Sequence, residues 1–217
     1  MENTVLIIAA LLTSTLSAMI GMGGGIILLG LMAIFIPDGY IVIALHGMIQ
    51  LIGNGTRTYV FKNAIKKEIV TKYFSGSIIG LSISSIIVLI LIHLYNVETA
   101  NEISFDYLKP LIGIYIIWFI YLRKKNQSDK TGNFFLVGIV GGLTSIFIGA
   151  VGPLIAPFFL RDQLTKENII ANKAACQIIT HLGKVPIFVY FFNLNYFEYS
   201  TILIPLMISV YIGTNIG

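Results

Sequence analysis

The sequence predicts an all-α polytopic membrane protein. It is built from two tandem repeats of a four-segment helical unit, and each repeat opens with a glycine-broken helix. Three observations lead to this fold class. Hydrophobic residues make up 56% of the 217 residues and charged residues only 11%, whereas a soluble domain carries about 25% charged residues. Apolar segments of membrane-spanning length recur along the chain. Two of these segments are interrupted by glycine-rich stretches.

The apolar segments give the order of the expected helices. They cover residues 4–36, 40–61, 69–95, 107–122, 133–160, 168–192 and 197–217. The first and fifth are too long for one span, which needs ~20 apolar residues. GMGGG at 21–25 breaks the first, and GAVGP at 149–153 breaks the fifth. Because glycine frees the backbone and proline removes an amide donor, both segments are predicted to be discontinuous helices.

The charged residues indicate the topology. Basic residues gather at 62–67 and 123–130, and acidic residues lie at 98–106, between two spans. Because basic loops favour the cytoplasm, the acidic loop is expected to face outside. All ten carboxylates lie at or near proposed loops or chain ends. The net charge of +4 is therefore interpreted as a topology signal, and no nucleic-acid partner is predicted.

Two landmarks recur at a shift of about 127 residues and define the predicted repeat. The stretch at 21–25 matches 149–153, and QLIGNGTR at 50–57 matches QIITHLGK at 177–184. We therefore expect a first transmembrane repeat over 1–122, a basic cytoplasmic linker over 123–132 and a second repeat over 133–217. The second repeat is expected to lack its last helix and the chain to be shortened, because it stops at Gly217 inside an apolar run.

The direction of the second repeat relative to the first stays open. If each broken segment crosses the membrane once, each unit has four crossings and the repeats are parallel. If each enters and returns as a re-entrant hairpin, three crossings remain and the repeats are inverted. Arg161 and Lys166 lie in one short loop, whereas 193–200 holds no basic residue. This difference favours the inverted arrangement.

A ladder of polar residues at helical spacing follows each broken segment. The ladders are His46, Gln50, Asn54 and Arg57 in the first half, and Lys173, Gln177, His181 and Lys184 in the second. Steps of 4, 4 and 3 place each set on one helix face. Because a Lys or Arg at the bilayer centre costs roughly 2.5–3.5 kcal/mol, these residues should face protein, water or a ligand. Cationic donors without carboxylates inside the spans suit an anion.

Each feature also has a plainer interpretation. Arg57 and Lys173 lie near helix ends, from which long side chains reach the membrane surface. The glutamines and His46 could bond between helices, and the glycines could serve close helix packing. The functional interpretation is that broken helices expose amides at half-helix N-termini, which attract anions. Cys176 is interpreted as a packed residue, and no metal site is expected.

With these motifs, the sequence resembles the sulfite exporter TauE/SafE family, also called the toluene-sulfonate uptake permease family. The resemblance rests on the stretch at 21–25, its echo at 149–153, and the segment Gln177-x-x-x-His181-x-x-Lys184. It covers essentially the whole chain, although the last helix of the family is expected to be absent. It implies a duplicated helical membrane transporter for sulfite, sulfonates, thiosulfate and related small organic anions.

We therefore predict a secondary transporter for small anions that works by alternating access, as a multi-pass protein of the plasma membrane. The expected solute is sulfur-containing, such as sulfite, thiosulfate or an organosulfonate. The expected partners are this solute and the lipid bilayer, and a homo-oligomer is left open. No nucleotide-binding motif is present. The alternatives are a non-transporting structural subunit and an intramembrane enzyme acting on lipid phosphate. The enzyme is disfavoured because no carboxylate at membrane depth would orient a nucleophile.

The predicted site combines the two glycine breaks with the two ladders. We expect no enzyme activity, no catalytic residue, no metal ligand and no cofactor. The predicted substrate-binding residues are Gly23, Gly24, Gly25, Gln50, Asn54, Arg57, Gly149, Gly152, Pro153, Gln177, His181 and Lys184.

Overall fold

Helices make up the regular structure of the described residues. A computed structural model describes the chain except for residues 1, 21–22, 104–107, 119–120, 122–132 and 161–163. Short 3-10 helices, η1 (Lys62–Ala64), η2 (Ala100–Glu102) and η4 (Tyr196–Tyr199), join the longer helices. The α-helices, in chain order, are α1 (Glu2–Ile20), α2 (Gly24–Phe35), α3 (Gly39–Val60), α4 (Lys67–Tyr95), α5 (Leu108–Ile117), α6 (Phe134–Ser145), α7 (Gly152–Phe159), α8 (Lys166–Phe191) and α9 (Ser200–Ile216).

Both predicted helix breaks are confirmed. The first apolar segment forms α1 and α2, and the fifth forms α6 and α7. Gly23 has φ 101° and Gly149 has φ 83°, in a backbone region that glycine enters without a steric cost. The breaks thus lie where glycine permits a sharp change of direction. Gly21 and the predicted linker at 123–132 lie outside the described residues.

The surface of the long helices fits a lipid environment. Four helical segments in the described part of the chain are long and apolar enough to cross a membrane: Asn3–Ile20, Lys67–Tyr95, Lys166–Phe191 and Tyr196–Ile216. Large apolar side chains on them are exposed, among them Ile86 of α4 at 55%. Exposed apolar surface of this extent needs an apolar solvent. The predicted fold class, an all-α polytopic membrane protein, is confirmed.

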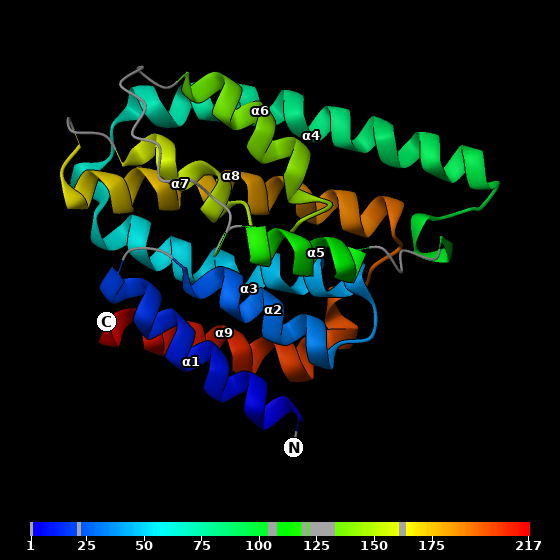
Figure 1. Ribbon diagram of the computed structural model, residues 1–217, viewed down its shortest axis with the longest axis horizontal. Helices are drawn as coiled ribbons and strands as arrows, with labels where there is room; N and C mark the ends of the chain where they lie inside the picture. Colours follow the sequence, from blue (N-terminus) through cyan, green and yellow to red (C-terminus); the bar gives the residue numbers. More distant parts are fainter. Residues whose placement is uncertain (1, 21–22, 104–107, 119–120, 122–132, 161–163) are drawn as a thin grey trace.

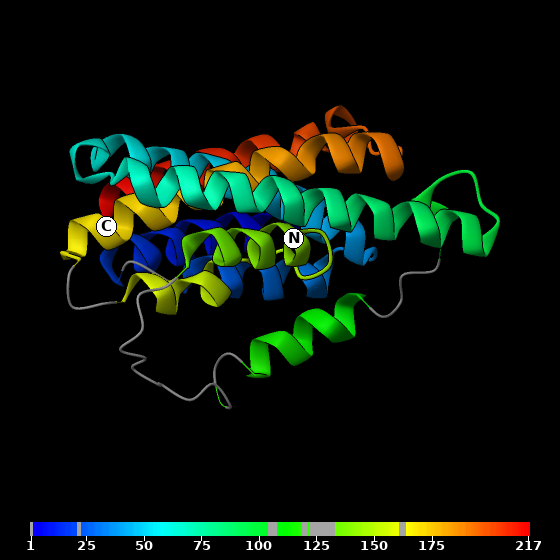
Figure 2. The same cartoon turned by 90° about the horizontal axis from the view of Figure 1, so that it is seen from above.

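Helices α3 and α8 lie side by side through the middle of the molecule and run antiparallel (Figures 1 and 2). At one end, the Lys66 amide donates to Asn172 Oδ1 at 2.8 Å, and Asn168 Nδ2 donates to the Ala64 carbonyl at 2.7 Å. Further along, the rings of His46 and His181 lie 6.2 Å apart. The end of α3 therefore meets the start of α8. An inverted repeat requires this relation between equivalent helices, although the repeat itself stays a prediction.

Each broken segment folds back on itself. A Cβ placed on Gly24 would lie 2.6 Å from the Cβ of Ser17, so the start of α2 packs against the end of α1. A Cβ on Gly141 of α6 would similarly lie 3.3 Å from Val151, just before α7. With 12 and 8 residues, α2 and α7 extend only about 18 and 12 Å. Neither short helix crosses a 30 Å hydrocarbon core alone.

The outer helices pair across the two halves of the chain. Figure 1 shows α4 of the first half along α6 of the second, and α9 of the second half along α1 of the first. Glycines four residues apart allow the backbones of α4 and α6 to touch: Gly76 and Gly80 on α4, and Gly138 and Gly142 on α6. In lipid, such close packing of small residues holds helices together. Helices from before residue 122 and from after residue 133 thus pack against each other, and the division into two repeats stays a prediction.

We expect the substitution Gly80→Ala to destabilise this interface. A Cβ at Gly80 would collide with the carbonyl oxygen of Ile139 and lie 2.7 Å from the Leu143 amide nitrogen, both of them backbone atoms. Overpacking of this kind costs about 1–3 kcal/mol, which should lower the unfolding temperature in detergent. The matched control is Gly113→Ala in α5, where a Cβ meets nothing within 4 Å. Equal unfolding temperatures for the two variants would contradict the proposed packing.

Candidate functional site

A cavity lies where α1, α2, α3, α7 and α8 meet, at the two helix breaks. The space open to the centres of water-sized spheres is about 30 Å³, which suits a solute of a few heavy atoms or a few water molecules. Most of the wall comes from the breaks and from α3 and α8. The described lining residues are Ser17, Gly23, Gly25, Ile26, His46, Gln50, Arg57, Ala150, Gly152, Pro153, Lys173 and Gln177.

The N-termini of two half-helices form parts of this wall. Helix α2 starts at Gly24, and its neighbours Gly25 and Ile26 line the cavity. Helix α7 starts at Gly152, followed by Pro153. The first amides of a helix have no intrahelical acceptor and carry a partial positive charge. Because Pro153 has no amide hydrogen, the second break offers one donor fewer than the first.

Two glutamine side chains lie directly against the two breaks. A Cβ placed on Gly25 would lie 3.2 Å from the carboxamide of Gln50, and a Cβ on Gly152 would lie 2.6 Å from Nε2 of Gln177. Any larger residue at these glycines would push the amides away. The glycines therefore allow each carboxamide to approach the first turn of a half-helix and to present a donor and an acceptor to the cavity.

The charged side chains at the cavity are basic. Arg57 is 9% exposed and Lys173 5% exposed. The Arg57 guanidinium donates through Nη1 to Asn54 Oδ1 at 3.3 Å, which orients it. The carboxylates with described side chains are all exposed, and they are Asp38, Glu68, Glu98, Glu102, Glu167 and Glu198. Within the described residues, no buried carboxylate thus faces the guanidinium of Arg57.

Three side-chain donors bond to carbonyl groups at the breaks or in the first turn after them. His46 Nε2 lies 2.8 Å from the Gly25 carbonyl, and because a carbonyl only accepts, this nitrogen carries the hydrogen. Tyr115 donates its hydroxyl to the Ala150 carbonyl at 2.8 Å. Lys184 Nζ donates to Gly149 O at 3.4 Å and also to a carbonyl of α3. The breaks are therefore held by α3, α5 and α8.

Seven of the twelve predicted binding residues belong to the described lining of the cavity. They are Gly23, Gly25, Gln50, Arg57, Gly152, Pro153 and Gln177. The other five lie behind the wall. Gly24 packs against α1, and Asn54 supports the guanidinium. Gly149 bonds to Lys184, and His181 is fully buried one turn before that lysine. Substrate binding by these residues stays a prediction.

Five lining residues were not in the predicted binding set. His46 and Lys173 belong to the polar ladders, so their position on the helix face could have included them. Ala150 and Ile26 are neighbours of predicted break residues. They line the cavity because of the backbone shape at the breaks, which the sequence pattern does not give. Ser17 lies on α1, and no sequence pattern points to it.

The described lining residues show a regular relation in sequence. Ten of the twelve form five pairs whose members lie 127 positions apart. The pairs are Gly23 with Ala150, Gly25 with Gly152, Ile26 with Pro153, His46 with Lys173, and Gln50 with Gln177. Ser17 and Arg57 are the remaining two. Each half of the chain thus contributes residues to one wall at the spacing of the predicted repeat.

Fold and site together define a multi-pass helical membrane protein with a small, positively charged cavity at two helix breaks. The family model of the sulfite exporter TauE/SafE matches residues 6–217, and the chain belongs to this family. It is therefore a membrane transporter of the sulfite-exporter type, as the resemblance implies. The comparison with curated proteins found no match, and neither did the comparison with solved structures.

We expect the substitution Tyr115→Phe to loosen the second break. It removes the donor to the buried Ala150 carbonyl while keeping the ring, and an unsatisfied buried carbonyl costs about 1–3 kcal/mol. The free energy of unfolding in mixed micelles should fall by this amount. Tyr121→Phe is the control, because Tyr121 is 79% exposed. A Tyr115 variant as stable as the Tyr121 variant would show that this hydrogen bond does not hold the break.

Proposed function

We propose that the protein is a secondary transporter that moves a small sulfur oxyanion through the cavity at the two breaks. The observation that carries this proposal is the composition of the cavity wall. It combines Arg57 and Lys173 with the carboxamides of Gln50 and Gln177, whereas every carboxylate with a described side chain is exposed.

The burial of the basic side chains points to an anionic ligand. A charged group taken out of water loses several kcal/mol of solvation unless an opposite charge and hydrogen bonds replace the water. An anion beside Arg57 would supply that opposite charge, and Lys173 lines the same cavity. The planar guanidinium of Arg57 presents parallel N–H groups to two oxygens of an oxyanion. The glutamines and the amides at the start of α2 would supply further donors.

The small cavity favours inorganic anions over larger organic sulfonates. Its volume, about 30 Å³ for the centres of water-sized spheres, corresponds to only a few waters. Sulfite and thiosulfate have few heavy atoms and three or more acceptor oxygens or sulfurs. An aromatic sulfonate would require the wall to open. We therefore propose sulfite or thiosulfate as the solute.

The paired lining residues support transport by alternating access. Five pairs at a constant separation support two repeats, and antiparallel α3 and α8 support their inversion. In transporters with inverted repeats, the substrate lies at the repeat interface, where broken helices meet. We propose the plasma membrane as the site of this activity. No ATP-binding motif is present, so an ion or solute gradient would drive the flux.

The two alternatives differ in what they require of the cavity. An intramembrane phosphate enzyme needs a nucleophile oriented by an acid or base, and no carboxylate is among the described lining residues. A structural subunit tolerates changes along both ladders and carries no flux. Anion flux through the purified protein therefore separates the proposal from both alternatives.

We expect Arg57→Ala and Gln177→Ala each to reduce sulfite and thiosulfate flux at least tenfold in proteoliposomes. Each change removes donors to the anion, worth about 1.5–3 kcal/mol for a hydrogen bond to a charged group. Lys67→Ala is the control, because Lys67 is an exposed cation at the start of α4. If wild-type protein carries no flux of either anion, the transporter proposal is wrong. If neither substitution changes the flux, the anion does not bind at this cavity.

A further inference from the structure

Arg57 and Lys184 occupy equivalent positions but have opposite surroundings. They lie 127 positions apart, the separation of the five lining pairs. Arg57 lines the cavity. Lys184 is 0% exposed and lies behind the wall, although both side chains end in a cation. The last residue of each ladder is therefore placed differently in the two halves of the chain: Arg57 reaches the cavity, and Lys184 does not.

Backbone acceptors hold Lys184 in this withdrawn position. Its Nζ donates to Ile43 O at 3.0 Å and to Gly149 O at 3.4 Å. Gly149 directly precedes Ala150, a lining residue, so the ammonium lies just behind the cavity wall. Gly47 provides the room: a Cβ there would collide with Cε of Lys184 and lie 2.9 Å from Nζ. At the position 127 residues after Gly47, the chain has Ala174.

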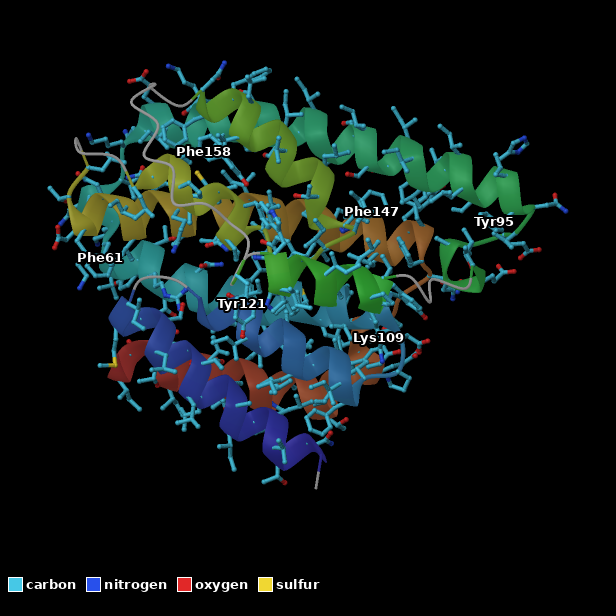
Figure 3. The ribbon with its side chains drawn as sticks, viewed as in Figure 1. Phe61, Tyr95, Lys109, Tyr121, Phe147 and Phe158 are labelled. Atoms are coloured by element: carbon cyan, nitrogen blue, oxygen red, sulfur yellow. The ribbon has the colours of Figure 1, made fainter. Side chains whose placement is uncertain are left out.

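The aromatic residues that follow Arg57 and Lys184 also differ in burial. Phe61 and Phe188 are also 127 positions apart. Phe188 is fully buried, its ring centroid 4.8 Å from that of Phe192, which in turn stacks on Tyr40 at 5.6 Å. Phe61 is only half-buried, at the end of the molecule where α3 finishes and α8 starts (Figure 3). The phenylalanine one turn after Lys184 is thus packed more tightly than the phenylalanine one turn after Arg57.

We propose that Lys184 is the anion-binding cation of the opposite-facing state, in which it replaces Arg57 at the cavity. This inference rests on the proposed function, transport of a small sulfur oxyanion between inverted repeats. In the described state, Arg57 binds the anion and Lys184 is withdrawn onto Ile43 and Gly149. In the opposite state, Lys184 enters the cavity and Arg57 withdraws toward Ile170, the residue equivalent to Ile43.

The small residues beside the ladders would bias the equilibrium toward the described state. Gly47 leaves space for a withdrawn Lys184, whereas Ala174 leaves one methyl group less space for a withdrawn Arg57. A ligand or a mutation shifts such an equilibrium only through its different interaction with the two states. Filling the space at Gly47 should therefore push the protein toward the opposite state.

The test compares Gly47→Ala with Gly55→Ala by hydrogen–deuterium exchange of the full chain in detergent. Both glycines are in α3, and a Cβ on Gly55 meets nothing within 4 Å. We expect Gly47→Ala to raise amide exchange over residues 185–196 at least threefold and to lower it over 57–66. Gly55→Ala should change neither segment. If Gly47→Ala and Gly55→Ala give the same exchange pattern, the inference is overturned.

A double substitution separates the proposed collision from any general effect on α3. Lys184→Ala removes the atoms that a Cβ at Gly47 would meet, so adding Gly47→Ala to that variant should leave its exchange pattern unchanged. A further shift in the double variant would contradict the role of Lys184. This comparison also remains informative if Gly47→Ala alone folds poorly, because the double variant has no collision.

Sulfite binding and flux provide the second readout. We expect Lys184→Ala to change the Kd for sulfite in detergent less than threefold and to lower sulfite flux at least tenfold, because only one of the two facing states loses its cation. A Kd for Lys184→Ala raised as much as that for Arg57→Ala would overturn the inference. The absence of flux in the wild type would instead refute the transporter proposal, while the exchange experiment needs no flux.

Discussion

The structure depends on how a broken helix can exist inside a membrane. Where α1 gives way to α2 and α6 gives way to α7, backbone groups lose their helical partners. Water is not present in the hydrocarbon core to replace those partners, and each unpaired group costs several kcal/mol. Tyr115 and Lys184 donate to the carbonyls of Ala150 and Gly149 at the second break, and His46 fixes the first turn of α2 through the Gly25 carbonyl. The amides at the half-helix starts are left to face the cavity.

Because backbone groups at the breaks need hydrogen-bond donors, the ladder helices pack directly against the breaks. The donors that hold the breaks come from α3, α5 and α8, and α3 and α8 also carry Arg57 and Lys173 into the wall. A shift of α3 against α8 would therefore move cations, glutamines and half-helix ends together. Such coupling is what a transporter needs, because the site must change its access without losing its donors. In the proposed mechanism, the same packed group of helices binds the solute and changes its access.

Much of the fold could be predicted because lipid imposes simple rules. Apolar length indicated the spans, and glycine indicated the breaks at Gly23 and Gly149, both confirmed by positive φ angles. The ladders placed Gln50 and Gln177 on inward faces, since polar side chains avoid acyl chains. The position of Lys184 could not be predicted in this way. Whether a lysine reaches a cavity or a backbone carbonyl depends on the space beside it, here left by Gly47 in another helix. Ser17 was missed because its neighbours come from α2 and not from its own helix.

The central claim is that a small sulfur oxyanion binds between the two breaks. Anomalous diffraction from crystals grown with selenite, the selenium analogue of sulfite, tests it most directly. We predict one selenium peak between Gln50 and Gln177, placed so that the selenite oxygens lie within about 4 Å of the charged nitrogens of Arg57 and Lys173, the N···O distance of an ion pair. A selenium peak only at other positions, in crystals of protein that transports selenite, would contradict it.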